Sequence, residues 1–397
     1  MEYQVLDLAG RQEEVLDNQG KSLPPMEVYA VRCPVLVQTK RGTILSFSNL
    51  KFGSQKDEAP SVTGLRRSFD GGKNWGPLQV FPMDMCGQPV YDELRDTVIL
   101  LCRTRHWKPG CQQERLLTEM DQVEGRVDER FWVCKSTDDG ATWSEPREVF
   151  IQGLQEHWTI KCCPTPGSGI QLKRQKDPRK NGRLVYPCGW ACMREGYNEF
   201  RDYLLYSDDG GDTWQVGGIL DCVGANEGTL TERQDGVIVL NCRNQGGTPG
   251  NLRIQGFSYD GGESFRMEET GMVDTLYDPI CHGSLANCTV DGHEYLFISL
   301  PAGPLGKPYN AWAQRVQIRE GVRECLTIYV SADGGKTYHK AKQMDEPGCF
   351  ASYSHLLAMQ DGRLLVAWES GPKIWQCKWN VYHMEDPRQL VRAAGLI

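Results

Sequence analysis

Residues 351–355, Ala-Ser-Tyr-Ser-His, contain the tyrosine in this sequence with the strongest case for a chemical role. A tyrosine here would ordinarily be a half-buried aromatic residue. A phenol can also act as a nucleophile if a base removes its proton, and converging arginines can hold a carboxylate through charge-assisted, bidentate hydrogen bonds. Residues of these types lie along nearly the whole chain, so a repeating fold would have to bring them to Tyr353: Arg32, Asp57, Glu227, Arg243, Arg323 and Glu369.

An eight-residue pattern, Ser-x-Asp-x-Gly-x-x-aromatic, supplies such a repeat. Its aspartate can accept hydrogen bonds from nearby backbone N–H groups, and its glycine can adopt φ > 0, as a tight hairpin turn requires. The aromatic side chain can fold back under the loop as an apolar plug. One copy would be a weak signal, but five copies predict five equivalent turns, at residues 68–75, 136–143, 207–214, 258–265 and 331–338.

Short apolar runs that follow turn residues form a second repeat. Their length and β-branched content are typical of buried strands. The six runs are residues 42–47, 96–102, 182–187, 236–240, 292–300 and 362–368. Together with the five turns they predict six similar antiparallel sheets packed radially, which is an all-β, six-bladed β-propeller. We expect residues 1–397 to form one such domain. A β-sandwich is the alternative fold, but it does not explain the repeat.

Composition narrows the classes of partner. The 397-residue chain carries a formal net charge of −8, which argues against nucleic acid as a partner but not against a local basic pocket for a small anion. We find no membrane-spanning apolar run and no signal peptide, and therefore expect a cytoplasmic protein. The sixteen cysteines include no C-x-x-C pair, so we expect mostly reduced thiols and no zinc site.

The five turns resemble the Asp boxes of the sialidase (neuraminidase) family, although other propellers carry them too. A more specific resemblance is the order and local setting of seven residues from Arg32 to Glu369. The matching elements are Val-Arg-Cys-Pro around Arg32, Lys-Asp-Glu around Asp57, Asn-Glu at Glu227, Leu-Asn-Cys-Arg ending at Arg243, Arg323 three residues before a strand, Tyr-Ser at Tyr353, and Glu369 at the end of the last strand run.

This resemblance implies a retaining exo-α-sialidase that hydrolyses terminal sialic (nonulosonic) acids through a tyrosyl covalent intermediate, with no cofactor or metal. Tyr353 would be the nucleophile, Glu227 its base, and Asp57 the acid/base. Arg32, Arg243 and Arg323 would bind the C1 carboxylate of the sugar, and Glu369 would brace Arg32. A neutral phenol suits this substrate because a carboxylate nucleophile would repel the sugar's own carboxylate. The implied partners are sialylated glycans of glycoproteins, oligosaccharides and gangliosides.

Some positions depart from the family pattern or leave choices open. Lys51 and Asn49 stand where the family has arginine and glutamate on the C4 side of the sugar, and Lys51 is a point charge rather than a planar fork. Met85 and Trp190 are candidates for the acyl pocket, with core packing as the alternative. A preference for deaminated sialic acid (Kdn) therefore stays open. Two further alternatives are a silent sialic-acid-binding propeller and a plain Asp-box scaffold. The long segment 105–130 could shape an aglycone site or be surface decoration.

Overall fold

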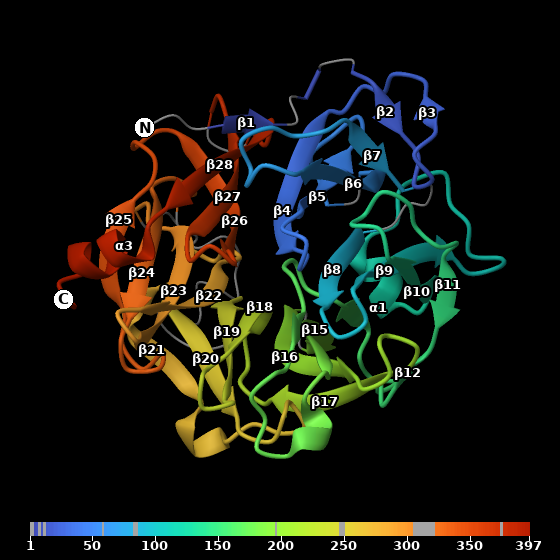
Figure 1. The fold of residues 1–397 in the computed structure, drawn as a ribbon. Helices are drawn as coiled ribbons and strands as arrows, with labels where there is room; N and C mark the ends of the chain where they lie inside the picture. Colours follow the sequence, from blue (N-terminus) through green and yellow to red (C-terminus); the bar gives the residue numbers. More distant parts are fainter. Residues whose placement is uncertain are drawn as a thin grey trace.

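Six sheets of mainly antiparallel strands surround a central axis in the computed structural model, which confirms the predicted six-bladed β-propeller (Figure 1). The structure describes residues 4–6, 9–10, 13–57, 59–81, 86–194, 197–245, 251–304, 322–373 and 376–397. In this part of the chain, no helix combines the length and apolar character needed to cross a bilayer.

We number the blades in chain order and list the strands of each. Blade 1 contains β2 (Val15–Leu16), β3 (Ser22–Leu23), β4 (Ala30–Gln38), β5 (Ile44–Lys51), β6 (Ser61–Ser68) and β7 (Leu78–Val80). Blade 2 contains β8 (Cys86–Asp92), β9 (Thr97–Trp107), β10 (Val127–Ser136) and β11 (Arg147–Val149). Blade 3 contains β12 (Ile151–Gln152), β13 (Ile160–Cys162), β14 (Ile170–Gln171), β15 (Leu184–Arg194), β16 (Tyr197–Ser207) and β17 (Trp214–Leu220).

Blade 4 contains β18 (Ala225–Glu232), β19 (Ile238–Asn244), β20 (Leu252–Ser258) and β21 (Gly271–Tyr277). Blade 5 contains β22 (Ser284–Val290), β23 (His293–Pro301), β24 (Leu326–Ser331) and β25 (His339–Gln343). Blade 6 contains β26 (Phe350–Ala358), β27 (Leu364–Gly371), β28 (Trp379–Glu385) and the N-terminal β1 (Gln4–Leu6). The short helices are α1 (Glu119–Val123), η1 (Pro178–Lys180), η2 (Met267–Glu269) and α3 (Pro387–Ala393).

All six predicted apolar runs are strands: β5, β9, β15, β19, β23 and β27. Each is the second long strand of its blade except β15, which is the first long strand of blade 3 and has the short β13 and β14 on its other edge. Such a strand pairs on both edges and is covered on both faces, which explains its continuous apolar sequence. The expectation of six similar sheets needs one correction, because the sheets of blades 1 and 3 have six strands rather than four. The added strands are two or three residues long, and β2 and β12 pair in parallel with β7 and β17.

The five repeated turns share one hydrogen-bond pattern, and each joins the last two strands of blades 1 to 5. In the first copy, Asp70 Oδ1 accepts hydrogen bonds from the Ser68 hydroxyl at 2.9 Å and from the Asn74 backbone N–H at 2.9 Å. The Gly72 N–H donates to the Ser68 hydroxyl, and Gly72 has φ +86°. The other four copies repeat these bonds. The turn chemistry inferred from the pattern is therefore correct.

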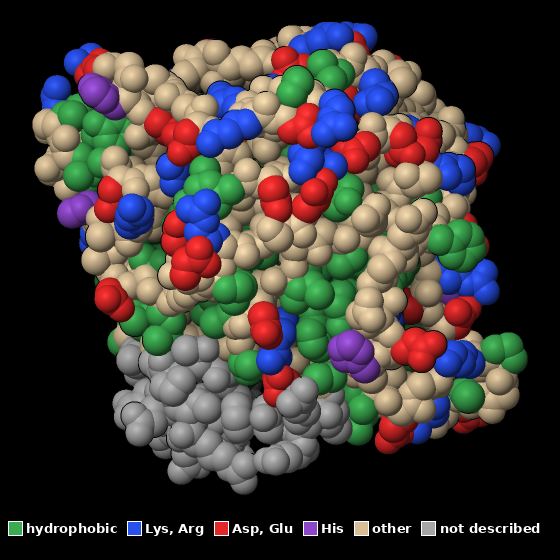
Figure 2. All heavy atoms as spheres, turned by 90° about the horizontal axis from the view of Figure 1, so that it is seen from below, with side chains coloured by type: hydrophobic (Ala, Val, Ile, Leu, Met, Phe, Trp, Pro, Cys, Tyr) green, Lys and Arg blue, Asp and Glu red, His purple; other side chains and the backbone are tan. Residues whose placement is uncertain are grey.

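The ring closes between the two ends of the chain. The N-terminal strand β1 pairs antiparallel with β28 and completes the sheet of blade 6, which packs against β4 of blade 1 (Figure 1). Side chains also join the two blades, since the Asn380 amide donates to Ser48 Oγ at 2.8 Å and the hydroxyls of Ser46 and Tyr382 lie 2.6 Å apart. On the face that lies at the bottom of Figure 1, basic and acidic side chains are interspersed (Figure 2).

Candidate active site

The innermost strands of blades 1, 4 and 6 each carry a β-bulge where a predicted site residue lies. The strand register shifts between Arg32 and Val35 in β4, between Asn226 and Thr229 in β18, and between Ala351 and Ser354 in β26. A bulge adds an unpaired residue and re-aims a side chain, and bulges are frequent beside active sites. Glu227 lies within the β18 bulge with φ +46°, a left-handed conformation that is uncommon for residues other than glycine.

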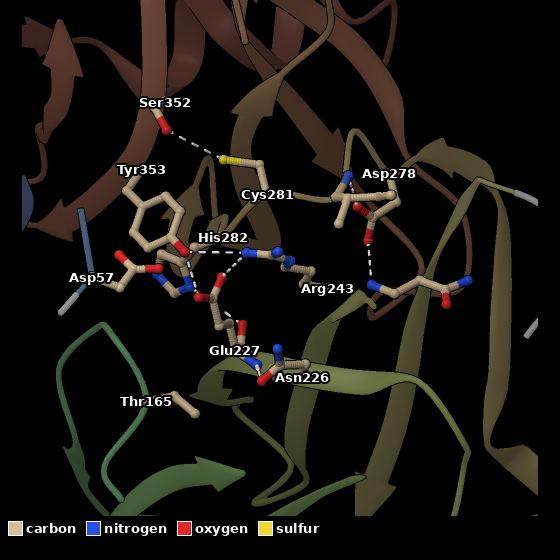
Figure 3. A network of polar contacts seen from close by, with 12 residues as sticks. Asp57, Thr165, Asn226, Glu227, Arg243, Asp278, Cys281, His282, Ser352 and Tyr353 are labelled. Atoms are coloured by element: carbon tan, nitrogen blue, oxygen red, sulfur yellow. Dashed lines mark hydrogen bonds and ion pairs between the residues drawn. The ribbon is translucent and has the colours of Figure 1, made fainter. Parts of the chain in front are cut away.

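These bulges bring Tyr353 and Glu227 together with Arg243, the penultimate residue of β19. The Tyr353 hydroxyl donates a hydrogen bond to Glu227 Oε1. Arg243 Nη1 donates to Glu227 Oε2 at 2.7 Å and to Tyr353 Oη at 3.1 Å, so the three groups form a closed triangle (Figure 3). A phenol that donates to a carboxylate is arranged to lose its proton to that carboxylate.

Two further arginines lie beside the same aromatic ring. The guanidinium carbons of Arg32 and Arg323 are 5.3 and 5.6 Å from the centroid of Tyr353. Arg323 is 8 % exposed, and it donates to Ser352 Oγ at 3.2 Å and to the Ile280 carbonyl at 3.1 Å. The three predicted arginines therefore come from blades 1, 4 and 5 and meet at a tyrosine of blade 6.

Glu369 and Asp57 lie on opposite sides of Arg32. Glu369 is fully buried, and its Oε1 accepts from Arg32 Nε at 3.3 Å and from the Cys33 N–H at 2.7 Å. Arg32 Nη1 donates to Asp57 Oδ1 at 2.8 Å, and the Asp57 side chain is 89 % exposed. One carboxylate thus anchors the arginine from within the fold, and the other faces solvent at the mouth of the site.

Lys51 is buried, and its ammonium donates to the main-chain carbonyl of Asp57 at 3.1 Å. This hydrogen bond supports the segment that carries Asp57, and the sugar contact expected of Lys51 from the sequence stays a prediction. Trp190 is buried in the core of blade 3, where it stacks on Trp158 with ring centroids 5.1 Å apart and planes 8° apart. This packing agrees with core packing, which was the alternative to an acyl-pocket role for Trp190. Met85 lies outside the described residues.

Electrostatics in the buried part of the site keep the proton on the tyrosine in the resting protein. Burial raises the pKa of Tyr353 well above its usual value, and the neighbouring Glu227 raises it further, while Arg243, Arg323 and Arg32 oppose this shift. Burial also raises the pKa of Glu227, but Arg243 and His282 outweigh it and hold this pKa at about 2. Glu227 is therefore an ionised acceptor, and the arginines favour any negative charge that develops on the phenol.

Three arginines and three carboxylates meet around Tyr353. Arg32, Arg243 and Arg323 contribute the positive charges, Glu227 and Glu369 lie inside the site, and Asp57 lies at its exposed edge. The Nε of Arg243 is also buried with no hydrogen-bond partner among the described residues. A buried donor without a partner is costly, and the three arginines together favour negative charge beside Tyr353.

Sequence reasoning missed the segment between β21 and β22. There His282 lies with its ring centroid 5.4 Å from that of Tyr353, and its Nδ1 is 3.2 Å from the Glu227 carbonyl oxygen. Burial lowers the pKa of His282 to about 4, so it is neutral at neutral pH. Asp278 is also buried and accepts from the backbone N–H groups of Asn244 and Ile280 at 2.6 Å each. The sequence did offer one signal for this segment, since it places a histidine and an aspartate in a stretch between strands that also contains proline and glycine.

No group of three or more His, Cys, Asp or Glu side chains in the described residues is arranged to hold a metal ion. The described cysteines are all free thiols.

Comparison with known proteins places this architecture in a family. The BNR repeat-like domain family matches residues 47–366. The chain is 28 % identical to a sialidase of Bacteroides fragilis (strain YCH46), over 79 % of this chain and 55 % of the relative. It is 25 % identical to a sialidase of Paraclostridium sordellii, over 86 % of this chain and 82 % of that protein.

Among solved structures, Trypanosoma rangeli sialidase in complex with 2,3-difluorosialic acid, described as a covalent intermediate, superposes with a TM-score of 0.70. The sequence identity is 16 %, and the match covers 99 % of this chain and 60 % of that one. This likeness shows the fold. The chain spans little more than half the length of the Bacteroides sialidase. From the repeat match over most of its length, and from its relatives, the chain belongs to the BNR repeat-like family and is related to the sialidases.

Proposed function

We propose that this protein is a retaining exo-α-sialidase that releases terminal nonulosonic acids from glycans through a covalent bond to Tyr353. The observation that carries the proposal is the triangle of Tyr353, Glu227 and Arg243, with Arg32 and Arg323 beside the same ring. Related proteins of bacteria and mammals are named sialidases, which supports the same reaction class.

In the proposed first step, the three arginines hold the C1 carboxylate of the sugar. Tyr353 Oη attacks the anomeric carbon while its proton passes to Glu227, and Asp57 donates a proton to the departing oxygen. The high pKa of the buried phenol means that proton transfer accompanies attack rather than precedes it. The arginines and carboxylates stabilise the oxocarbenium-like transition state.

In the second step, Asp57 accepts a proton from water as the water oxygen attacks the anomeric carbon. The bond to Tyr353 breaks, and the phenol recovers its proton from Glu227. Two inversions at one carbon give net retention of configuration. The exposure of Asp57 suits this role, since the group must exchange protons with the leaving group and with water. Glu227 lies deeper, with its side chain 14 % exposed, and it is the carboxylate that the phenol contacts.

The test is a hydrolysis assay with 4-methylumbelliferyl glycosides of acetylated and deaminated sialic acid side by side, which also reports the preference at C5. A 2,3-difluorosialic acid should add one sugar mass to the protein, located by peptide mapping at Tyr353, and Tyr353→Phe should abolish the adduct. NMR of the first-formed product should show the α anomer. Absence of hydrolysis by the folded wild type, with binding retained, would instead identify a silent sialic-acid-binding propeller.

A further inference from the structure

A buried carboxylate lies behind the candidate site, on the side of Arg243 that faces away from Tyr353 (Figure 3). This carboxylate belongs to Asp278, the first residue after β21 in the segment that leads to β22. Asp278 is fully buried and forms an ion pair at 3.3 Å with Arg253, which is also fully buried. The cost of removing two charges from water offsets most of the attraction within such a pair, so stability alone does not explain it.

The side chain of Asp278 is surrounded by N–H donors. Its Oδ2 accepts a hydrogen bond from the Asn244 backbone N–H at 2.6 Å, and its Oδ1 accepts one from the Ile280 backbone N–H at 2.6 Å. Arg253 Nη1 is a third donor. Burial raises the pKa of Asp278, while Arg253 and the two backbone N–H groups oppose this shift. Because all three groups donate, they match an ionised carboxylate, which can only accept.

The first of these backbone bonds supports the end of the strand that carries Arg243. The ladder between β19 and β20 runs from Ile238 to Cys242, and β19 continues beyond it with Arg243 and Asn244. On its other edge, β19 stays paired with β18 as far as Asn244. Asp278 Oδ2 takes the place of a strand carbonyl at the Asn244 N–H, so it completes the support of the backbone beside Arg243.

The second backbone bond fixes an acceptor of Arg323. Ile280 is buried and has φ +57°, a left-handed conformation that is costly for a β-branched residue. Its N–H donates to Asp278 Oδ1, and its carbonyl oxygen accepts from Arg323 Nη2 at 3.1 Å. Arg253 supports the same segment, because its Nη1 also donates to the Cys281 carbonyl at 2.8 Å. Asp278 and Arg253 therefore hold the peptide groups that present the Ile280 carbonyl to Arg323.

We propose that Asp278 is a positioning residue that holds Arg243 and Arg323 ready for the carboxylate of a sugar acid, a role that rests on the proposed function. One carboxylate oxygen ties down the backbone beside Arg243, and the other ties down the peptide that supplies an acceptor to Arg323. The two guanidinium groups are thereby held relative to one another before a ligand enters. Groups that are ordered in advance bind more tightly than groups that must be ordered on binding.

The experiment measures how strongly the protein prefers a sugar acid over its methyl ester. The probe is 2,3-didehydro-2-deoxy-neuraminic acid in its N-acetylated and deaminated forms, titrated calorimetrically as acid and as ester into wild type and Asp278→Asn. The asparagine oxygen can accept one of the two backbone N–H bonds, but its NH₂ group cannot accept the other. We expect wild type to bind the acid at least about 100-fold more tightly than the ester, as two charge-assisted interactions imply, and Asp278→Asn to lower this ratio at least about tenfold.

Asp92→Asn is the matched control. Asp92 is also fully buried, and it accepts from the Arg95 backbone N–H at 3.1 Å and from Arg95 Nη1 at 2.8 Å, but it ends β8 at the turn to β9. Both variants should unfold at lower urea concentrations, yet Asp92→Asn should keep the acid-to-ester ratio within about threefold of wild type. A general loosening of the fold weakens acid and ester binding alike, so the ratio separates positioning from stability.

A second variant covers the case in which Asp278→Asn does not fold. Asp278→Glu keeps the negative charge that Arg253 needs but moves both oxygens by one methylene, so it should lower the acid-to-ester ratio in the same direction. An unchanged ratio in the folded variant would overturn the positioning role and leave the sialidase activity untouched. An equal fall in Asp92→Asn would overturn it as well.

The proposed function can fail separately from the role of Asp278. A wild type that prefers the acid but hydrolyses no sialoside would refute the activity, while the comparison of Asp278→Asn with Asp92→Asn would still decide the positioning role. A wild type that binds acid and ester equally, or binds neither, would overturn both, because its arginines would then not select a carboxylate.

Discussion

Replacing Asp57 gives the sharpest test of the mechanism, because the structure separates its chemistry from its contribution to stability. Its side chain is 89 % exposed, and its ion pair with Arg32 is one of two that Arg32 makes with described residues. Exposed ion pairs contribute less than about 1 kcal/mol, so Asp57→Ala should unfold at nearly the wild-type urea concentration. Asp57→Asn is the matched variant, since its amide oxygen can still accept the Arg32 bond but the side chain cannot donate an acidic proton.

General acid catalysis contributes about 10²–10⁴-fold, equivalent to about 2.7–5.4 kcal/mol at 1.36 kcal/mol for each tenfold change. A galactose hydroxyl needs that proton, whereas 4-methylumbelliferone or nitrophenol leaves without it. Both variants should therefore lose about 10²–10⁴-fold in kcat/KM on sialyl-lactose and less than about tenfold on the aryl glycoside. With the aryl substrate, the slowed second step should produce a burst of released phenol. Equal losses on the two substrates would refute the reasoning, because a distorted pocket does not distinguish leaving groups.

Three other outcomes follow from the same geometry. Tyr353→Phe removes one oxygen from a packed ring and should lose most turnover while keeping the wild-type circular dichroism spectrum; near-normal kcat in the folded variant would exclude a covalent role. Arg243→Ala should cost about 2–5 kcal/mol in kcat/KM, and a glycoside without the C1 carboxylate should be a non-substrate, so its rapid cleavage would contradict the clamp. Burial lowers the pKa of His282 to about 4 and of His355 to about 3. The unfolded chain binds protons at these histidines below about pH 6.5, so each histidine should lower the free energy of unfolding by about 2 kcal/mol between pH 7.5 and pH 5. Burial raises the pKa of Asp202 and Asp345 to about 7, and these carboxyls act in the opposite direction over the same range. Urea unfolding of wild type and His355→Gln at the two pH values isolates the histidine: the stability of the wild type relative to the variant should fall by about 2 kcal/mol, and an unchanged difference would mean that His355 is not buried and neutral.

Features encoded within a few adjacent residues could be predicted from the sequence. Each Asp-box turn is closed by bonds among eight consecutive residues, so its pattern is complete in the sequence. The strands β5, β9, β15, β19, β23 and β27 are covered on both faces and therefore have continuous apolar runs. By contrast, the two-residue strand β12 joins β17 only where the fold brings it alongside, and a pair of residues such as Ile151–Gln152 carries no periodicity that could reveal it.

The candidate site likewise contains features that neighbouring residues encode and features that depend on the whole fold. The seven residues from Arg32 to Glu369 could be selected because each has a distinctive local setting. The bulges that aim Arg32, Glu227 and Tyr353 depend on how neighbouring strands pair, which no single strand encodes. The hydrogen bond from the Lys51 ammonium to the Asp57 carbonyl could not be predicted, because it depends on the path of the following loop. His282 was missed because it meets Tyr353 only where the connection between blades 4 and 5 lies against blade 6.

The closure of the ring between blades 6 and 1 has a consequence for how the protein would lose activity. The border that β1 helps to close is also the border crossed by the Arg32–Glu369 ion pair and the Cys33–Glu369 hydrogen bond. A partial opening there, with every sheet otherwise intact, would release Arg32 from its anchor. The border that closes the propeller therefore also keeps Arg32 in position. Heat inactivation should begin below the temperature at which the sheets melt, and residues along this seam should exchange their amide hydrogens before those of blade 3.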